Sequence, residues 1–205
     1  AQQLSIEDSV LINNSASRGG AVFLDACSAY VVDSQIVSNE AEARGGAFFV
    51  NDSYLSIRTS EVGYNDAGST TATNSRGGGL YSRESTVHLT DTAVIYNQAT
   101  GLNAYGGGAF LYYSTMVVSG TTSMGAQING GFGGNLASSA GGGVALRGPS
   151  GFWGDIVDFG YGVTDNGPDD LAGYSEFDDI WTSASGYGND EVSMTCNTNH
   201  PSVCQ

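Results

Sequence analysis

A glycine motif that recurs five times along the chain constrains the fold more than any other feature of the sequence. It consists of two glycines and a further small residue, at Gly19-Gly20-Ala21, Gly45-Gly46-Ala47, Gly77-Gly78-Gly79, Gly106-Gly107-Gly108 and Gly141-Gly142-Gly143. Consecutive copies lie 26, 32, 29 and 35 residues apart. Periods of this size are typical of stacked repeats, in which each repeat buries its apolar face only against its neighbours.

Apolar residues alternate at fixed distances after each motif. Eight and ten residues beyond the small residue stand Ala29/Val31, Leu55/Ile57, Val87/Leu89, Met116/Val118 and Gly151/Trp153. Period-two alternation indicates a β-strand with one buried face. We identify three short strands per repeat and predict an all-β, right-handed parallel β-helix, or solenoid, of about five to six coils. Residues 1–160 form the solenoid in this prediction, and 161–205 form a small C-terminal β cap.

Polar residues occupy further columns of the repeat. Asn39, Asn65 and Asn97 stand eighteen residues after the small residue, and Asn14 precedes them. We predict that these asparagines stack as an inward hydrogen-bonded ladder at a corner of the coil. In the fifth repeat Ala126 takes this place, and the repeat degrades. A second column, six residues after the small residue, holds Cys27, Ser53, Ser85, Ser114 and Pro149.

The strand after each glycine motif is apolar on both faces, and only one face can point inward. We favour the aliphatic face inside, which leaves Phe23, Phe49, Tyr81 and Phe110 as an outer aromatic column and a candidate interaction face. Two alternatives stay open: the opposite assignment, and cover by another part of the same chain. Arg18, Arg44 and Arg76 form a basic column beside a glycine corner, which we interpret as structural, with Glu40, Glu42 or Asp66 as acidic neighbours.

The C-terminal residues are strongly acidic, and we expect a hairpin within 174–196. Asp165, Asp169 and Asp170 offer oxygen ligands suited to Ca²⁺, although their spacing is not that of an EF-hand and a solvated acidic loop is the alternative. No other cofactor is predicted. Cys196 and Cys204 are close enough in sequence to form a disulfide, which is typical of extracellular proteins.

Charge and composition restrict the classes of partner. The formal net charge is −15, with six arginines and no lysine, so nucleic acid and anionic membranes are poor partners. No apolar run is long enough to span a membrane. The chain begins Ala1-Gln2-Gln3, as expected of a mature secreted protein or an excised piece. Asn13 and Asn51 lie in glycosylation sequons, and we expect an extracellular location.

The sequence offers no catalytic constellation. The carboxylates of the regular coils are scattered over different columns, whereas a glycosidase needs two that face each other. His88 and His200 are far apart in the repeat scheme, so a zinc site is not expected. We therefore predict that the protein is not an enzyme.

The repeats resemble those of bacterial surface proteins, especially the polymorphic outer-membrane proteins of chlamydiae. That family combines a Gly-Gly-Ala-aliphatic motif, here Gly19–Val22 and Gly45–Phe48, with a Phe-x-x-Asn motif. Here the second motif has aliphatic residues in place of Phe, at Leu11…Asn14, Ile36…Asn39, Val62…Asn65 and Val94…Asn97. The resemblance covers about residues 4–147 and implies a surface-displayed adhesive or structural protein.

The start of the chain suggests self-association. Leu4 and Ile6 match the columns of Leu55 and Ile57, so the sequence begins inside an incomplete coil whose edge needs a cover. We predict an extracellular structural or adhesive protein whose copies stack end to end into a filament or surface assembly. A missing upstream segment is the alternative cover. The alternative function is a β-helix that binds or cleaves carbohydrate, with glycans as its ligands.

Overall fold

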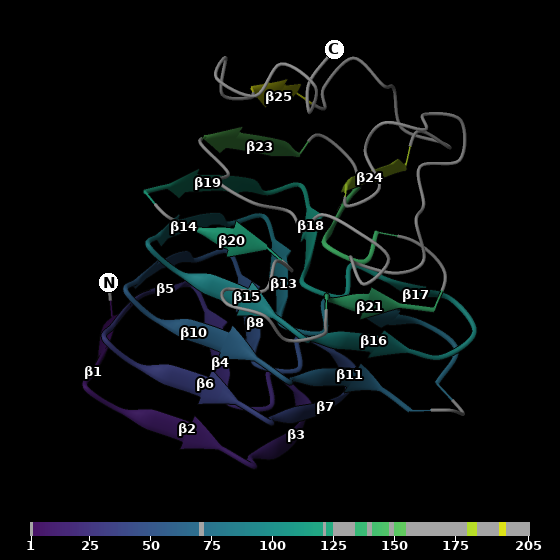
Figure 1. Ribbon diagram of the computed structural model, residues 1–205, viewed down its shortest axis with the longest axis horizontal. Coiled ribbons are helices and arrows are strands. Elements are labelled where there is room, and N and C mark those ends of the chain that lie inside the picture. The colour runs from purple at the N-terminus through teal and green to yellow at the C-terminus, as the bar shows by residue number, and fades with distance from the viewer. Residues whose placement is uncertain are drawn as a thin grey trace.

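The computed structural model confirms a parallel β-solenoid, shown in Figure 1. It describes residues 2–69, 72–120, 122–124, 134–138, 141–147, 150–154, 180–183 and 193–195. About four turns span residues 2–119, and every strand pair with a defined register is parallel.

Four sheets, named A to D in chain order, form the sides of the solenoid. Sheet A contains β1 (Gln2–Glu7), β5 (Cys27–Val32), β9 (Tyr54–Arg58), β14 (Thr86–Thr90), β19 (Thr115–Ser119), β23 (Gly151–Gly154) and β25 (Ser193–Thr195). Sheet B contains β2 (Val10–Ile12), β6 (Gln35–Val37), β10 (Glu61–Gly63), β15 (Ala93–Ile95) and β20 (Ser123–Met124). Sheet D contains β4 (Val22–Asp25), β8 (Phe48–Asn51), β13 (Leu80–Arg83), β18 (Ala109–Tyr112), β22 (Val144–Arg147) and β24 (Ile180–Ser183).

Sheet C is the side that the sequence prediction of three strands per repeat missed. It contains β3 (Ser15–Arg18), β7 (Glu40–Arg44), β11 (Asp66–Gly68), β12 (Ser75–Arg76), β16 (Gln98–Thr100), β17 (Ala104–Tyr105) and β21 (Leu136–Ala137). Its inward residues are alanines rather than bulky aliphatics, as at Ala41, Ala67 and Ala99. Small residues give a weak alternation signal, and the insertions that follow β11 and β16 interrupt it further. Each complete turn therefore has four sides.

Each corner in the described turns contains a residue in the left-handed region of backbone space. At the A–B, B–C and D–A corners these residues are not glycines and have φ between 45° and 58°, except Gly120, with φ of 68°, at the A–B corner after β19. At the C–D corner the first glycine of each motif has φ between 60° and 67°. A Cβ atom on Gly45 would collide with the carbonyl oxygen of Phe48, and one on Gly46 with that of Gly78 in the next turn. The motif is thus required by the sharp bend and by the close approach of neighbouring turns.

The aliphatic face points inward, as predicted. A continuous core contains Val22, Leu24, Phe48, Val50, Leu80, Leu111 and Leu146 from sheet D, packed against the alternating residues of sheets A and B. Leu4 and Ile6 pair with Ala29 and Val31, which pair in turn with Leu55 and Ile57. The sequence columns are therefore confirmed for sheet D and, as far as β19, for sheet A.

Stacked asparagines form a hydrogen-bonded ladder at the B–C corner. The Oδ1 atom of each asparagine accepts hydrogen bonds from the backbone N–H and the Nδ2 of the asparagine one turn earlier, at 2.8–3.1 Å. The ladder runs through Asn14, Asn39, Asn65, Asn97 and Asn135. Asn135, not Ala126, occupies the fifth place, because the insertion in that turn precedes the asparagine instead of following it.

Serine residues form a second ladder at the D–A corner. The Oγ atoms of Ser53, Ser85, Ser114 and Ser150 each accept a hydrogen bond from the backbone N–H at the same corner of the preceding turn. Ser150, not Pro149, takes the fifth place, so the prediction was one residue out of register there. Phe152 and Gly154 accordingly pair with Met116 and Val118, in place of the predicted Gly151 and Trp153.

Two short strands from the predicted cap region extend the solenoid sheets. β24 pairs with β22 in sheet D, and β25 pairs with β23 in sheet A. The remainder of residues 161–205 lies outside the described residues, together with Asp165, Asp169, Asp170, Cys196 and Cys204. The domain division, the Ca²⁺ site and the disulfide therefore stay predictions.

Candidate functional site

The first turn of the solenoid forms an open edge, which we call the N-terminal edge and define as β1 to β4. Each of these strands pairs with a neighbour on one side only, and in Figure 1 they form the purple end of the stack. Leu4, Val10, Ile12 and Phe23 are between 38% and 60% exposed, and they are four of the eight exposed large hydrophobic residues in the described part of the chain. Apolar surface is thus concentrated where backbone pairing stops.

The asparagine ladder stops at the same edge. In later turns Nδ2 also donates to a carbonyl oxygen of the turn before, as Asn39 does to Leu11 and Asn65 to Ile36. Asn14 is exposed, and within the described residues its Oδ1 has no donor from a preceding turn. The edge therefore presents apolar side chains together with the incomplete end of a polar ladder.

The aromatic column lies outside the aliphatic core, but it is not the exposed face that we predicted. The rings of Phe23, Phe49, Tyr81 and Phe110 stack with centroid separations of 5.0, 5.1 and 5.7 Å and interplanar angles of 10° or less. Phe49, Tyr81 and Phe110 are nevertheless only 1–3% exposed. Phe23 alone is open, at 52%. The alternative of cover by the same chain is the correct one for the three buried rings.

Arginine side chains contribute to this cover. The guanidinium carbon of Arg18 lies 5.5 Å from the ring centroid of Phe49, that of Arg44 lies 5.3 Å from Tyr81, and that of Arg76 lies 5.0 Å from Phe110. Each arginine therefore covers the ring of the following turn, a favourable cation–π geometry. No arginine of an earlier turn covers Phe23, and its exposure follows.

We define Arg18, Arg44 and Arg76, which are register partners on sheet C, as the arginine column; Arg147 lies on β22 of sheet D, in register with Tyr112. The expected pairing with Glu40, Glu42 or Asp66 is wrong: among the described residues the one ion pair joins Arg83 to Glu84, at 3.0 Å. The Nε atoms of Arg76 and Arg147 are buried without a hydrogen-bond partner. Burial lowers the pKa of Arg76, and the nearby charges of Arg147 and Arg44 lower it further.

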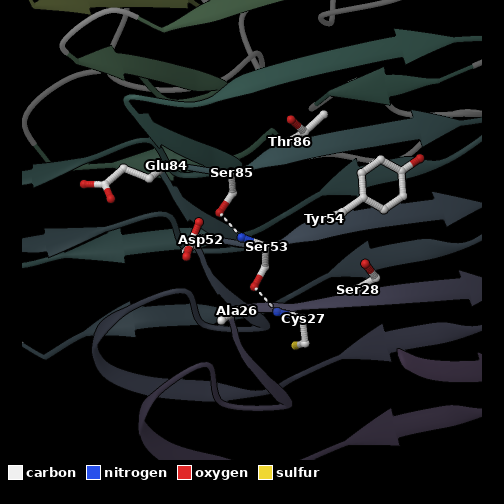
Figure 2. Close-up of a pocket in the computed structure, with 9 residues that line it drawn as sticks. All are labelled: Ala26, Cys27, Ser28, Asp52, Ser53, Tyr54, Glu84, Ser85 and Thr86. Atoms are coloured by element: carbon white, nitrogen blue, oxygen red, sulfur yellow. Dashed lines mark hydrogen bonds between the residues drawn. The ribbon is translucent and has the colours of Figure 1, made fainter. Parts of the chain in front are cut away.

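An open groove of about 310 Å³ crosses three turns at the D–A corner. It is lined by Ala26, Cys27, Ser28, Asp52, Ser53, Tyr54, Glu84, Ser85 and Thr86. Figure 2 shows Asp52 and Glu84 on one side of the serine ladder and Tyr54 and Thr86 on the other. Cys27, a half-buried free thiol, continues the serine column at its N-terminal end. The sequence indicated the column of Cys27, Ser53 and Ser85, but not that a groove crosses it.

Other predicted site residues lie apart from one another. Asn13 is exposed at a left-handed corner, whereas Asn51 is half-buried and donates a 2.7 Å hydrogen bond to Asp25. Glycosylation of either stays a prediction. His88 lies on the outer face of β14, 5.3 Å from the Tyr54 ring, and His200 is outside the described residues. Within the described ranges no three potential metal ligands come together.

The carboxyl group of Asp66, on β11 of sheet C, is half-buried. Burial raises its pKa from 3.8 to about 6; a hydrogen bond from Thr100 opposes the rise, and the neighbouring Glu40 adds to it. Asp66 and Glu40 are register partners on adjacent strands of sheet C. Sequence reasoning proposed Asp66 only as a partner for arginine.

Comparison with known proteins assigns no family to the chain. No family model, no curated protein and no solved structure matches it. The structure supports a parallel β-solenoid fold, and the resemblance to the chlamydial repeats stays a prediction from the sequence motifs. None of the described residues belongs to a helix long and apolar enough to cross a membrane.

Proposed function

We propose that this is an extracellular structural or adhesive solenoid whose copies associate end to end through the N-terminal edge. The observation that carries the proposal is the coincidence, in one turn, of exposed Leu4, Val10 and Ile12 with unpaired strand edges. Proteins normally cover such edges, because unpaired strands recruit other strands. We also propose that the solenoid is right-handed, has about five to six coils and ends in a C-terminal cap.

The occupant we propose is the C-terminal end of a second copy. Every turn of this chain already docks on the next through parallel pairing and corner ladders, so another copy carries the same four-sided path. In sheets A and D the strands at the opposite ends from β1 and β4 are β25 and β24. Joining these ends gives a head-to-tail contact, which does not close on itself and builds a fibre. Backbone pairing and apolar contact, rather than charge, hold such a contact together.

Lysine substitutions at the N-terminal edge test end-to-end association. Leu4→Lys places a cation in the apolar column of the edge, and Val10→Lys places one on its outer surface. Leu102→Lys is the matched control, because Leu102 is 76% exposed and lies between β16 and β17, away from the edge. By light scattering and electron microscopy we expect concentration-dependent fibres or oligomers for the wild type and Leu102→Lys, and smaller species for both edge variants. A wild type that stays monomeric at high concentration, with β1 protected from hydrogen exchange, refutes end-to-end association.

A second candidate function is carbohydrate binding at the D–A corner groove. Hydroxyl groups, the carboxylates of Asp52 and Glu84, and the ring of Tyr54 supply the mixture of hydrogen bonding and apolar contact that sugars need. Titration with oligosaccharides, followed by calorimetry and a reducing-end assay, tests binding and cleavage together. Tyr54→Ala is expected to abolish binding and Tyr64→Ala to preserve it; no heat with any neutral or acidic oligosaccharide excludes this function.

A further inference from the structure

The side-chain ladders that join neighbouring turns all run in one direction along the solenoid. A third ladder, at the A–B corner, has the backbone N–H of Ser9 donating to Ser34 Oγ at 3.1 Å and that of Ser34 donating to Ser60 Oγ at 3.1 Å. The asparagine and serine ladders have the same direction, from an N–H group of one turn to a side-chain oxygen of the following turn. The side-chain oxygens at these corners therefore face the N-terminal end.

The serine hydroxyl groups cannot reverse this direction, because their hydrogens are already used. Ser34 Oγ donates to the Val32 carbonyl of its own turn at 2.7 Å, and Ser9 Oγ donates to the Glu7 carbonyl at 2.6 Å. A hydroxyl group has one hydrogen and two lone pairs. Each of these oxygens is therefore left only as an acceptor for an N–H group of the preceding turn.

The backbone at the corners has the same polarity. Along a strand successive N–H groups alternate between the two neighbouring strands, so the edge of a strand offers donors and acceptors in equal measure. At each corner, by contrast, two consecutive N–H groups donate to the following turn, and the first of the two residues is left-handed. The pairs are Asp8 with Ser9, Ser38 with Asn39, Gly19 with Gly20, and Ala26 with Cys27.

The N-terminal edge consequently ends in acceptors at two corners. Ser9 Oγ and Asn14 Oδ1 hold the ladder positions of Ser34 and Asn39, which accept N–H groups from the turn before. The described residues contain no turn before β1 to β4. Asn14 Nδ2 already donates to Asn39 Oδ1 at 2.9 Å. The partner that complements this edge has N–H donors at the A–B and B–C corners.

We propose that the N-terminal edge accepts only the donor end of a second copy, so that copies associate in one orientation and the assembly is unipolar. This orientation rests on the end-to-end association proposed above and specifies its partner: a C-terminal coil whose corner N–H groups face Ser9 and Asn14. The joint repeats the arrangement found between successive turns of one chain. Two N-terminal edges would place acceptor against acceptor, and buried oxygens without donors are unfavourable.

Removal of the two acceptors tests the proposed contact. Ser9→Ala removes one acceptor and should weaken association about fivefold; Asn14→Ala removes an oxygen that accepts two hydrogen bonds and should weaken it about thirtyfold. The matched controls are Ser5→Ala, on β1 but away from the corners, and Asn74→Ala, exposed in the loop before β12. Sedimentation velocity over a concentration series measures association, and thermal melting establishes that each variant is folded.

Cysteine cross-linking reports the orientation independently of affinity. Ser5 begins a column of sheet A that continues through Tyr30 and Ser56 to Thr195 on β25. A joint that continues sheet A in register brings Ser5 of one copy within about 4.8 Å of Thr195 of the next, which suits a disulfide. Ser5→Cys with Thr195→Cys should therefore give an intermolecular bond between positions 5 and 195, identified by mass spectrometry after oxidation.

The outcomes separate the orientation from association itself. Bonds between two copies of position 5 in the single variant Ser5→Cys show that N-terminal edges pair with each other and refute the proposed orientation, while end-to-end association stands. Association that Ser9→Ala and Asn14→Ala leave unchanged, or weaken no more than Ser5→Ala and Asn74→Ala do, refutes the role of the corner acceptors in the same way. A wild type that does not associate at high concentration removes both proposals.

Discussion

Asn65→Leu should destabilise the solenoid more than most single substitutions. Asn65 is fully buried, and its side chain takes part in four hydrogen bonds: with the backbone N–H of Asn39 at 2.9 Å, Asn39 Nδ2 at 3.0 Å, the Ile36 carbonyl at 2.9 Å and Asn97 Oδ1 at 2.8 Å. At about 1 kcal/mol for each hydrogen bond, Asn65→Leu should lower the free energy of unfolding by about 4 kcal/mol. Leucine has a similar volume, but it leaves the Asn39 N–H and the Ile36 carbonyl without partners.

Asn14→Leu is the internal control for this estimate. The Asn14 side chain makes one hydrogen bond, from Nδ2 to Asn39 Oδ1, and is exposed at the end of the ladder. Loss of this hydrogen bond should lower the free energy of unfolding by about 0.5 kcal/mol. Urea denaturation followed by circular dichroism measures the free energy of unfolding of both variants. Equal effects for the two positions, or an unchanged value for Asn65→Leu, would refute the reasoning that the buried ladder stabilises the corner.

Two further substitutions test single side chains. Ser82→Val should raise the free energy of unfolding by about 1 kcal/mol, because the Ser82 hydroxyl is buried in the aliphatic core without a partner; a lower melting temperature would contradict this. Asp66→Asn should stabilise the protein at pH 7 by about 1 kcal/mol after allowance for solvent screening of the half-buried group. Because folding raises the pKa of Asp66 to about 6, the stability contributed by its protonated form is complete below about pH 3.8 and is lost as pH rises through 6. The difference between wild type and Asp66→Asn, measured by thermal melts, should therefore grow over this window and stay level above it; a difference independent of pH would contradict the assignment.

Columns counted without gaps from the glycine motif predicted the regular turns correctly. They failed in the fifth turn, where the insertion precedes the asparagine instead of following it. The columns of Leu55 and Ile57 and the stacked Asn39, Asn65 and Asn97 depend on spacings that insertions between the asparagine and the glycine motif leave intact. In the fifth turn the extra residues come before the asparagine, so counting from the glycine motif led to Ala126 rather than Asn135. An asparagine followed two residues later by alanine, as at Asn135 and Ala137, was the signal that could have found it.

The surface was harder to predict than the core. Arginine beside aromatic residues admits two arrangements, an ion pair or a stacked ring, and the sequence spacing does not distinguish them. The choice depends on which turn the side chain reaches: Arg44 contacts Tyr81 of the following turn, although Phe48 and Phe49 are nearer in sequence. Such contacts depend on the pairing of turns, which becomes known only when the whole coil is built. For the same reason the D–A groove, made by residues from three turns, had no local signature.

The separation between corners and sides shows where a function can change without loss of the fold. Asparagine, serine and glycine at the corners satisfy backbone groups and provide left-handed bends, and they recur through turns of different length. Insertions after β11 and β16 are accommodated because the ladder resumes on the far side of each loop. The outward residues of the sides are under no such constraint. The arginine column lies there, whereas the D–A groove and the N-terminal edge each combine outward residues with part of a corner ladder. Substitutions at the edge, or at the serines of the groove, should therefore affect stability as well as association or binding.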